Sequence, residues 1–110
     1  MVISNNEQPS ICRVIIPALN EAQSIGQVLA DIDRQLVSEV IVVDNGSIDQ
    51  TGQVAAASGA TVLEEKERGY GAACLKGLDY VKDTAPDTDI IVFLDADYAD
   101  YPEEISKVIQ

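Results

Sequence analysis

The sequence contains no histidine, only two cysteines and a single phenylalanine among its 110 residues. Without histidine, zinc sites built from cysteine and histidine and histidine-based catalytic triads are excluded. Lysine and arginine are scarce too, with seven against nineteen aspartates and glutamates, and the formal net charge is −12. No basic cluster is present that could follow a phosphate backbone, so we expect no nucleic-acid partner. Any chemistry in this chain must therefore rest on carboxylates.

The negative charge also sets a condition on anionic ligands. A chain of this charge repels a nucleoside diphosphate unless a cation bridges the two, so such a ligand would need Mg²⁺ or Mn²⁺.

Residues 1–10 are polar and lack a long apolar stretch, which predicts a loosely attached or disordered segment, no membrane span and a cytoplasmic location. Cys12 and Cys74 fall in an expected strand and an expected helix, and we interpret both as reduced core residues.

Apolar residues form strand-like runs that alternate with segments of helical spacing. This alternation predicts an α/β fold with a parallel sheet covered by helices on both faces, and one domain over residues 11–110. Strands are expected at 11–17, 39–44, 60–64 and 89–94. The spacing of Ile25, Val28, Leu29 and Ile32 predicts the first helix, and a second helix is expected at 49–58. The third is expected to run through Leu75, Leu78 and Val81. A last helix is expected to begin at Pro102, with Glu103 and Glu104 in its first turn.

Polar residues follow every expected strand, in segments 17–21, 44–47, 64–69 and 95–97. In an open parallel sheet, ligands bind beyond the carboxyl ends of the strands, so these segments should meet at one edge of the sheet. Because the chain stops within the expected last helix, we also expect the sheet to keep an exposed edge strand.

Asp95-Ala96-Asp97 directly follows an apolar strand. A turn there can bring both carboxylates to one hard cation, with the small Ala96 allowing close approach. The alternative is that Asp95 caps a turn and Asp97 is solvated. The strong negative charge of the chain and the neighbouring polar strand ends favour the metal site.

Other strand-end residues have two interpretations each. Asp44 could accept hydrogen bonds from a nucleobase or ribose, or could stabilise an Asx turn. Asn20 could be a helix N-cap with Glu21 complementing the helix dipole, or both could contact a ligand. Arg68, followed by Gly69 and a flexible backbone, could approach a diphosphate or could be a solvated side chain.

The segments PALNEAQSIG, EVIVVDNGSIDQTG, ERGYGAACLKGL and VFLDADYADYPEE resemble consecutive signatures of family 2 glycosyltransferases of the GT-A type. The likeness is greatest to bacterial enzymes similar to dolichol-phosphate mannosyltransferase and spans residues 14–104. It implies a Rossmann-like sheet that ends after the strand carrying the DXD motif. Two positions depart from the family: Ile48 stands where threonine is usual, and Ala22 where a second glutamate is frequent.

The resemblance also implies how the site works. Asp95-Ala96-Asp97 would be the DXD motif, holding a cation that offsets charge on the leaving nucleoside diphosphate. The acceptor site and catalytic base would belong to the family's C-terminal half, so we assign no catalytic residue here and expect a partner chain or a homodimer to supply that half. The predicted residues for a UDP- or GDP-linked sugar are Pro17, Ala18, Leu19, Glu21, Asp44, Gly46, Ser47, Arg68, Gly69, Asp95 and Ala96, with Asp95 and Asp97 as metal ligands.

Three other functions are consistent with parts of the pattern. A non-catalytic binding or regulatory module would keep the fold and the ligand site without transfer. A phosphoacceptor signalling domain fits the length and the aspartates, but it needs an acidic pair after the first strand, where this chain has residues 17–21. A sugar-nucleotide pyrophosphorylase would open with a glycine-rich basic loop, which is absent. We therefore favour the glycosyltransferase interpretation.

Overall fold

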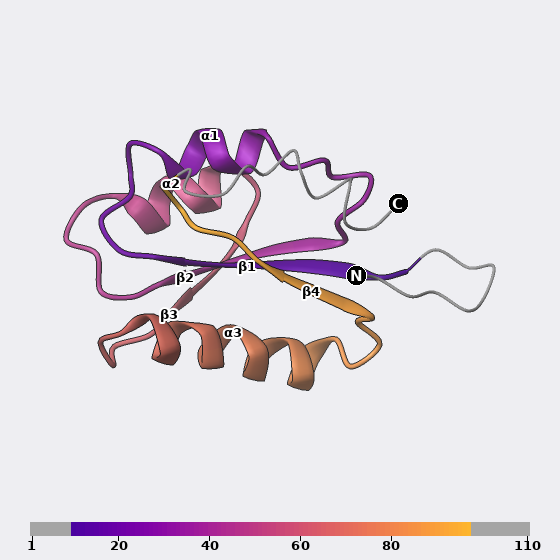
Figure 1. Cartoon of the computed structure of the whole chain (residues 1–110). Helices are drawn as coiled ribbons and strands as arrows, with labels where there is room; N and C mark the ends of the chain where they lie inside the picture. The colour runs from indigo at the N-terminus through magenta and orange to yellow at the C-terminus, as the bar shows by residue number, and fades with distance from the viewer. Residues whose placement is uncertain (1–9, 98–110) are drawn as a thin grey trace.

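The computed structural model describes residues 10–97 and contains one sheet of four parallel strands in the order β3-β2-β1-β4 (Figure 1). This arrangement confirms the predicted α/β class and parallel sheet. The first strand lies inside the sheet, and the chain crosses to its other side for β4. The elements in chain order are β1 (Cys12–Ala18), α1 (Ile25–Ala30), β2 (Glu39–Asp44), α2 (Thr51–Ala57), β3 (Thr61–Glu64), α3 (Tyr70–Thr84) and β4 (Ile90–Phe93).

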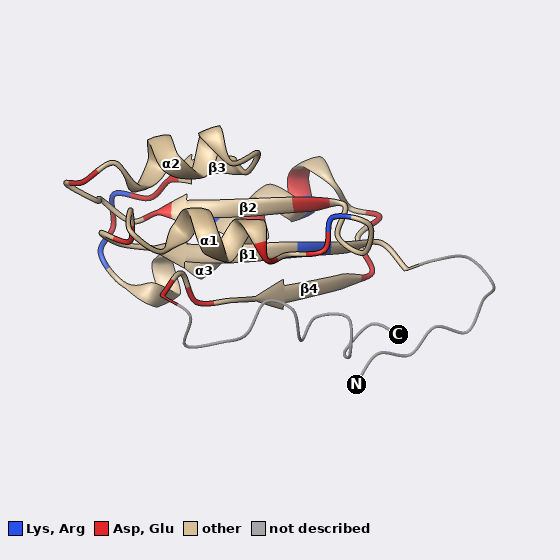
Figure 2. Ribbon diagram, turned by 90° about the horizontal axis from the view of Figure 1, so that it is seen from above, with Lys and Arg blue, Asp and Glu red and all other residues tan. Residues whose placement is uncertain are grey.

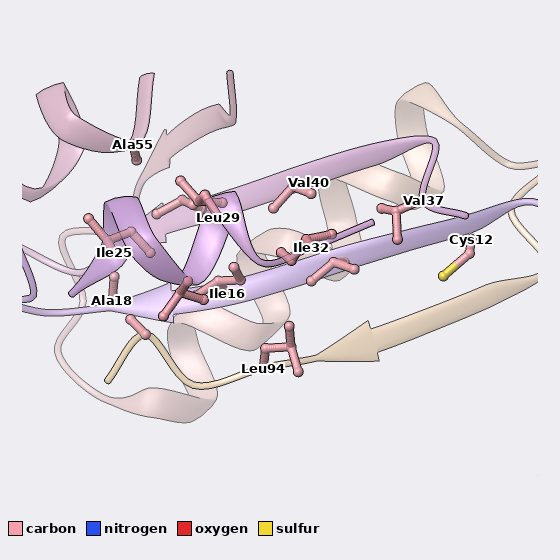
Figure 3. Packing of buried hydrophobic residues seen from close by; sticks show 14 residues of the cluster. Cys12, Ile16, Ala18, Ile25, Leu29, Ile32, Val37, Val40, Ala55 and Leu94 are labelled. Carbon is pink, nitrogen blue, oxygen red and sulfur yellow. The ribbon is translucent and has the colours of Figure 1, made fainter. Parts of the chain in front are cut away.

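The helices cover opposite faces of the sheet, with α1 and α2 on one side and α3 on the other (Figure 1). Successive residues of a strand point to opposite faces, so the β-branched runs of β1 and β2 supply two separate cores. In the first core, Ile16 and Ala18 of β1 meet Ile25 and Leu29 of α1 (Figure 3). The smaller core on the other face includes Ile15. The four apolar residues predicted for the first helix are all buried, but α1 ends at Ala30 and Ile32 follows it.

Helix α3 approaches the sheet more closely than the sequence pattern indicates. Its buried residues are Ala73, Gly77 and Val81, whereas Leu75, which the helical spacing placed on the apolar face, is 62% exposed. A Cβ atom at Gly77 would lie 2.6 Å from Ile15 Cγ2, so small residues face the sheet and the larger leucine is displaced outward. For the same helix, the prediction that Cys74 lies in the core is only partly correct. Cys74 is half-buried and free, whereas Cys12 is buried and free.

The edge strand β4 is not fully covered on the α3 side. Ile91 and Phe93 are each a little more than one-third exposed. Ile91 also lines a groove of about 470 Å³ against α3, with Leu75 and Leu78 on its other wall. The prediction that helices cover both faces therefore holds for the inner strands and only in part for β4.

A polar network joins the strands at their amino ends, on the side of the sheet away from the predicted site. Glu39 accepts hydrogen bonds from Arg13 Nε (3.0 Å), Thr61 Oγ1 (2.7 Å) and Tyr80 Oη (2.7 Å). Burial raises the pKa of Glu39, but these hydrogen bonds and the charge of Arg13 outweigh it, so the pKa lies below its ordinary value. Glu39 therefore stays ionised and ties β1, β3 and α3 to β2.

Some predictions concern residues outside the described range. These are the loosely attached N-terminus before residue 10 and the last helix from Pro102 with Glu103 and Glu104. Within residues 10–97, none of the helices combines the length and the apolar character that crossing a bilayer requires.

Candidate functional site

The predicted strand-end residues meet at the carboxyl edge of the sheet, the side toward which all four strands run. Ala18, Asp44 and Glu64 are level with one another in the ladder of β1, β2 and β3. Beside them, β4 ends next to β1 and leads into Asp95-Ala96-Asp97. Acidic segments (red) and the basic segments of the β3–α3 loop (blue) gather at this edge (Figure 2). It is also the place where the strand order reverses between β1 and β4, the usual ligand position in such sheets.

A cavity of about 360 Å³ opens at this edge beside the start of α3. Residues from the end of β1, the β2–α2 loop and the β3–α3 loop line it, so three consecutive polar segments contribute. The predicted residues Pro17, Ala18, Leu19, Arg68 and Gly69 are all among its walls. Sequence reasoning missed the other three lining residues, which are Asn45, Tyr70 and Ala73.

Asn45 is the residue that shapes one wall of this cavity. It is 5% exposed, and its side-chain amide donates hydrogen bonds to the carbonyl oxygens of Glu65 (2.9 Å) and Glu67 (2.7 Å). Its side-chain oxygen accepts a hydrogen bond from the backbone N–H of Gly69 at 3.0 Å. Three bonds from one buried amide thus fix the loop that carries Arg68.

Arg68 lies across the loop that follows β2. A Cβ atom at Gly46 would lie 3.9 Å from Arg68 Nε, and Gly46 has a φ of +87°. Glycine adopts this left-handed conformation without strain. The contact distance itself is ordinary, so the left-handed backbone is the feature that favours glycine at this position. The structure therefore brings Gly46, Arg68 and Gly69 together, although Gly46 does not line the cavity.

Asp44, at the end of β2, and Ser47 and Glu21, on the neighbouring loops, are not among the residues that line the cavity. Asp44 Oδ1 accepts the N–H of Ser47 at 3.0 Å. This bond stabilises the turn after β2, as considered for this residue, but it reaches the third residue on rather than the second, as an Asx turn would. Asn20 is not the N-cap of α1, because that position belongs to Ser24. Asn20 has a φ of +54°, and its side chain instead accepts the N–H of Ile48 at 2.9 Å.

The loop after β1 and the loop after β2 are joined by further hydrogen bonds. The N–H of Asn20 donates to Ser47 Oγ at 2.9 Å, and the N–H of Glu21 donates to Thr51 Oγ1 at 2.9 Å. Asp49 accepts from the N–H of Ala22 at 3.2 Å and from the hydroxyl of Thr51. The hydrogen bond from the Thr51 hydroxyl is the main reason that the pKa of Asp49 lies below its ordinary value, and hydrogen bonds from backbone N–H groups lower it further. These contacts make the two loops one unit.

The Asp95-Ala96-Asp97 loop is held close to the start of α1. Ala96 is 4% exposed, Asp95 is half-buried and Asp97 is exposed. Among residues 10–97, no group of three or more metal-ligating side chains converges. A cation at this loop would therefore take at most two carboxylates from the described chain. That donor set fits Mg²⁺ or Mn²⁺, which are commonly held by one or two carboxylates together with phosphates and water.

Comparisons with known proteins agree with this fold and show its family. The sequence model of glycosyl transferase family 2 matches residues 13–110. A dolichyl-phosphate hexose transferase from Haloferax volcanii is 42% identical over 93 residues, which are 83% of this chain and 38% of that protein. The crystal structure of glucosyl-3-phosphoglycerate synthase from Mycobacterium tuberculosis with UDP superposes with a TM-score of 0.74 at 34% identity, covering 88% of this chain and 38% of that chain.

The same synthase has also been solved with a metal ion. Its complex with Mn²⁺, UDP and glucosyl-3-phosphoglycerate superposes with a TM-score of 0.68 at 36% identity, covering 79% of this chain and 33% of that chain. A further structure of the synthase contains Mg²⁺ and UDP. In all four of these comparisons, the present chain spans two-fifths or less of the matched protein.

Proposed function

Because the chain belongs to glycosyl transferase family 2, we propose that residues 10–97 bind the nucleotide-sugar donor of a glycosyl transfer through a divalent cation. The observation that carries this proposal is the position of the cavity and the Asp95-Ala96-Asp97 loop at the ends of neighbouring strands, β1 and β4. A nucleoside in the cavity would thus have its diphosphate beside two carboxylates. The related synthase, crystallised with Mn²⁺ and UDP, supports this pairing of ligands.

Different residues at the carboxyl edge of the sheet bind different parts of the donor. The apolar wall from Pro17 to Leu19 packs against the nucleoside, and the Arg68 guanidinium pairs with a phosphate oxygen. Asp95 and Asp97 hold the cation. When bound, the cation offsets the charge that develops on the leaving nucleoside diphosphate. Hydrogen bonds of Asp44, Ser47 and Glu21, with the turn at Gly46, keep the loops around the donor in place. Asp44, beside the cavity, is the residue we assign to a base or ribose contact.

The acceptor and the base that deprotonates it belong, in this proposal, to the part of the family that lies beyond the described residues. That part is on the same polypeptide, on a partner chain or on a second copy. Asp100, Glu103 and Glu104 follow Asp97 in the sequence and are candidate bases, with Asp100 favoured because it precedes the expected helix; all three lie outside the described residues. A cytoplasmic location is part of the proposal.

Calorimetric titration tests the proposal. UDP, GDP, UDP-glucose and GDP-mannose are titrated into the 110-residue chain with Mn²⁺, with Mg²⁺ and with EDTA. We expect at least one nucleotide to bind with the cation and to bind far more weakly in EDTA, because the acidic edge repels the bare diphosphate. Asp97→Ala should abolish the cation-dependent part and leave the fold intact, since Asp97 is exposed.

Two outcomes would contradict the proposal. The first is equal binding with and without the cation, and the second is unchanged affinity in folded Asp97→Ala. Incubating the same samples with UDP- or GDP-sugars and polyprenyl phosphate should give no transfer product from the 110-residue chain alone. Product formation by that chain would show that the acceptor site and base are already present within it.

A further inference from the structure

Ser24 occupies the N-cap position of α1, yet its hydroxyl does not cap the helix. A serine at this position usually accepts a hydrogen bond from a backbone N–H of the first turn. Here no such bond is present. The Ser24 hydroxyl instead lies 2.6 Å from the carbonyl oxygen of Ala96, with the Glu21 oxygens farther away at 3.2 and 3.4 Å. A hydroxyl has one proton to donate, so the short contact identifies Ala96 as the acceptor.

The acceptor of this bond lies between the two aspartates assigned to the cation. Ala96 is buried in the same core as Ile25 and Val28 of α1, so its carbonyl oxygen is held in a defined position. Two residues before Ala96, the N–H of Leu94 donates to the carbonyl oxygen of Ile15 at 3.1 Å and extends the β1–β4 pairing. The loop is therefore tied to β1 on one side of Asp95 and to the start of α1 on the other.

From this geometry we propose that Ser24 is a positioning residue for the cation site. Its hydrogen bond to Ala96 fixes the backbone between Asp95 and Asp97 and so keeps both carboxylates oriented for one ion. This proposal rests on the proposed function, because it assumes that these aspartates hold a cation with the nucleotide. Ser24 itself touches neither the ion nor the donor.

The test measures the Mn²⁺ concentration that gives half-maximal UDP binding at a fixed UDP concentration. In Ser24→Ala this concentration should rise about threefold to tenfold, the loss expected for one hydrogen bond. Binding at saturating Mn²⁺ should return to the wild-type level, because the cavity is unchanged. Ser24→Thr, which keeps the hydroxyl, should restore the wild-type midpoint.

Ser58→Ala is the matched control, since Ser58 also donates its hydroxyl to a backbone carbonyl, that of Val54 at 2.9 Å, but at the exposed end of α2. Its midpoint should equal that of the wild type. Thermal unfolding checks that each variant folds. If Ser24→Ala does not fold, Ser24→Thr and Ser24→Val are compared instead, because their side chains have the same shape and only threonine keeps the hydroxyl.

The outcomes separate the two proposals. If wild-type protein binds UDP with Mn²⁺ and folded Ser24→Ala has the same midpoint, the positioning role is wrong and the proposed function stands. If UDP affinity falls equally at every Mn²⁺ concentration, Ser24 supports the cavity rather than the cation loop, and the positioning role is again overturned. If wild-type protein binds neither UDP nor GDP at any Mn²⁺ concentration, both proposals fail.

Discussion

At the scale of single residues, the cavity depends on the buried polar side chain of Asn45. Asn45 follows β2 and spans to the β3–α3 loop, where it binds three backbone groups. An amide suits this position because it both donates and accepts, whereas a carboxylate of similar shape can only accept. The wall that carries Arg68 is therefore set by the chemistry of one amide group.

We expect Asn45→Ala to lower the free energy of unfolding by about 1 to 3 kcal/mol, because it removes hydrogen bonds to groups beside a buried position. It should also weaken UDP binding, since the segment carrying Arg68 and Gly69 loses its anchor. Asn45→Asp should behave similarly, because the carboxylate faces the carbonyl oxygens of Glu65 and Glu67. Urea unfolding and calorimetry measure the two effects.

Gln53→Ala provides the comparison, since Gln53 is an exposed amide on α2. It should change neither the stability nor the affinity. Wild-type UDP affinity in folded Asn45→Ala would show that the β3–α3 loop does not depend on this amide.

At the scale of elements, the strands could be predicted to within one or two residues, because β-branched runs bounded by turn residues indicate their limits. That the strand ends form one edge also followed from the sequence. The buried face of α3 did not, because its contact with β1 depends on packing distance rather than on spacing. The roles of Asn45 and Ser24 could not be predicted either, because their hydrogen-bond partners are distant in the sequence. The partners of Asn45 lie 20 or more residues away, and the Ala96 carbonyl that Ser24 binds lies 72 residues away.

The close contact of α3 with β1 gives a prediction for two glycines of one helix. Gly77→Ala should lower the free energy of unfolding by about 1 to 3 kcal/mol, because its Cβ would overlap Ile15. Gly71→Ala should raise it by about 0.5 to 1 kcal/mol, because alanine favours the helix and nothing lies within 4 Å of the added atom. Chemical denaturation measures both, and equal effects of the two substitutions would contradict the packing account.

At the scale of the whole molecule, repulsion between negative charges destabilises the folded state. The chain carries a formal net charge of −12, and folding brings these charges closer together than they are in the unfolded chain. The Arg13–Glu39 ion pair, with its atoms 3.0 Å apart, offsets part of this repulsion. A bound cation at the carboxyl edge would relieve it further.

Salt should therefore stabilise the protein. Raising NaCl from about 10 mM to about 150 mM shortens the screening length from about 30 Å to about 8 Å, and we expect Tm to rise by a few degrees in a buffer free of divalent ions. A variant with Glu64→Gln, Glu67→Gln, Asp79→Asn and Asp83→Asn, all exposed positions, should have a higher Tm at low salt and respond less to NaCl. A Tm that falls with NaCl in the wild type would refute this account.

The strand order has a consequence for how the chain folds. β1 comes first in the sequence but pairs with both β2 and β4, and the N–H of Ile11 reaches the Asp89 carboxylate across 78 residues. Pairings of such long separation are slow, because the loop must close before the contact forms. During synthesis β1 therefore emerges with one edge unpaired until residues 90–93 leave the ribosome, an interval in which strand-to-strand aggregation competes with folding. The residues that line the cavity precede this step, so within residues 10–97 the aspartates of the Asp95-Ala96-Asp97 loop are the last part of the site to be assembled.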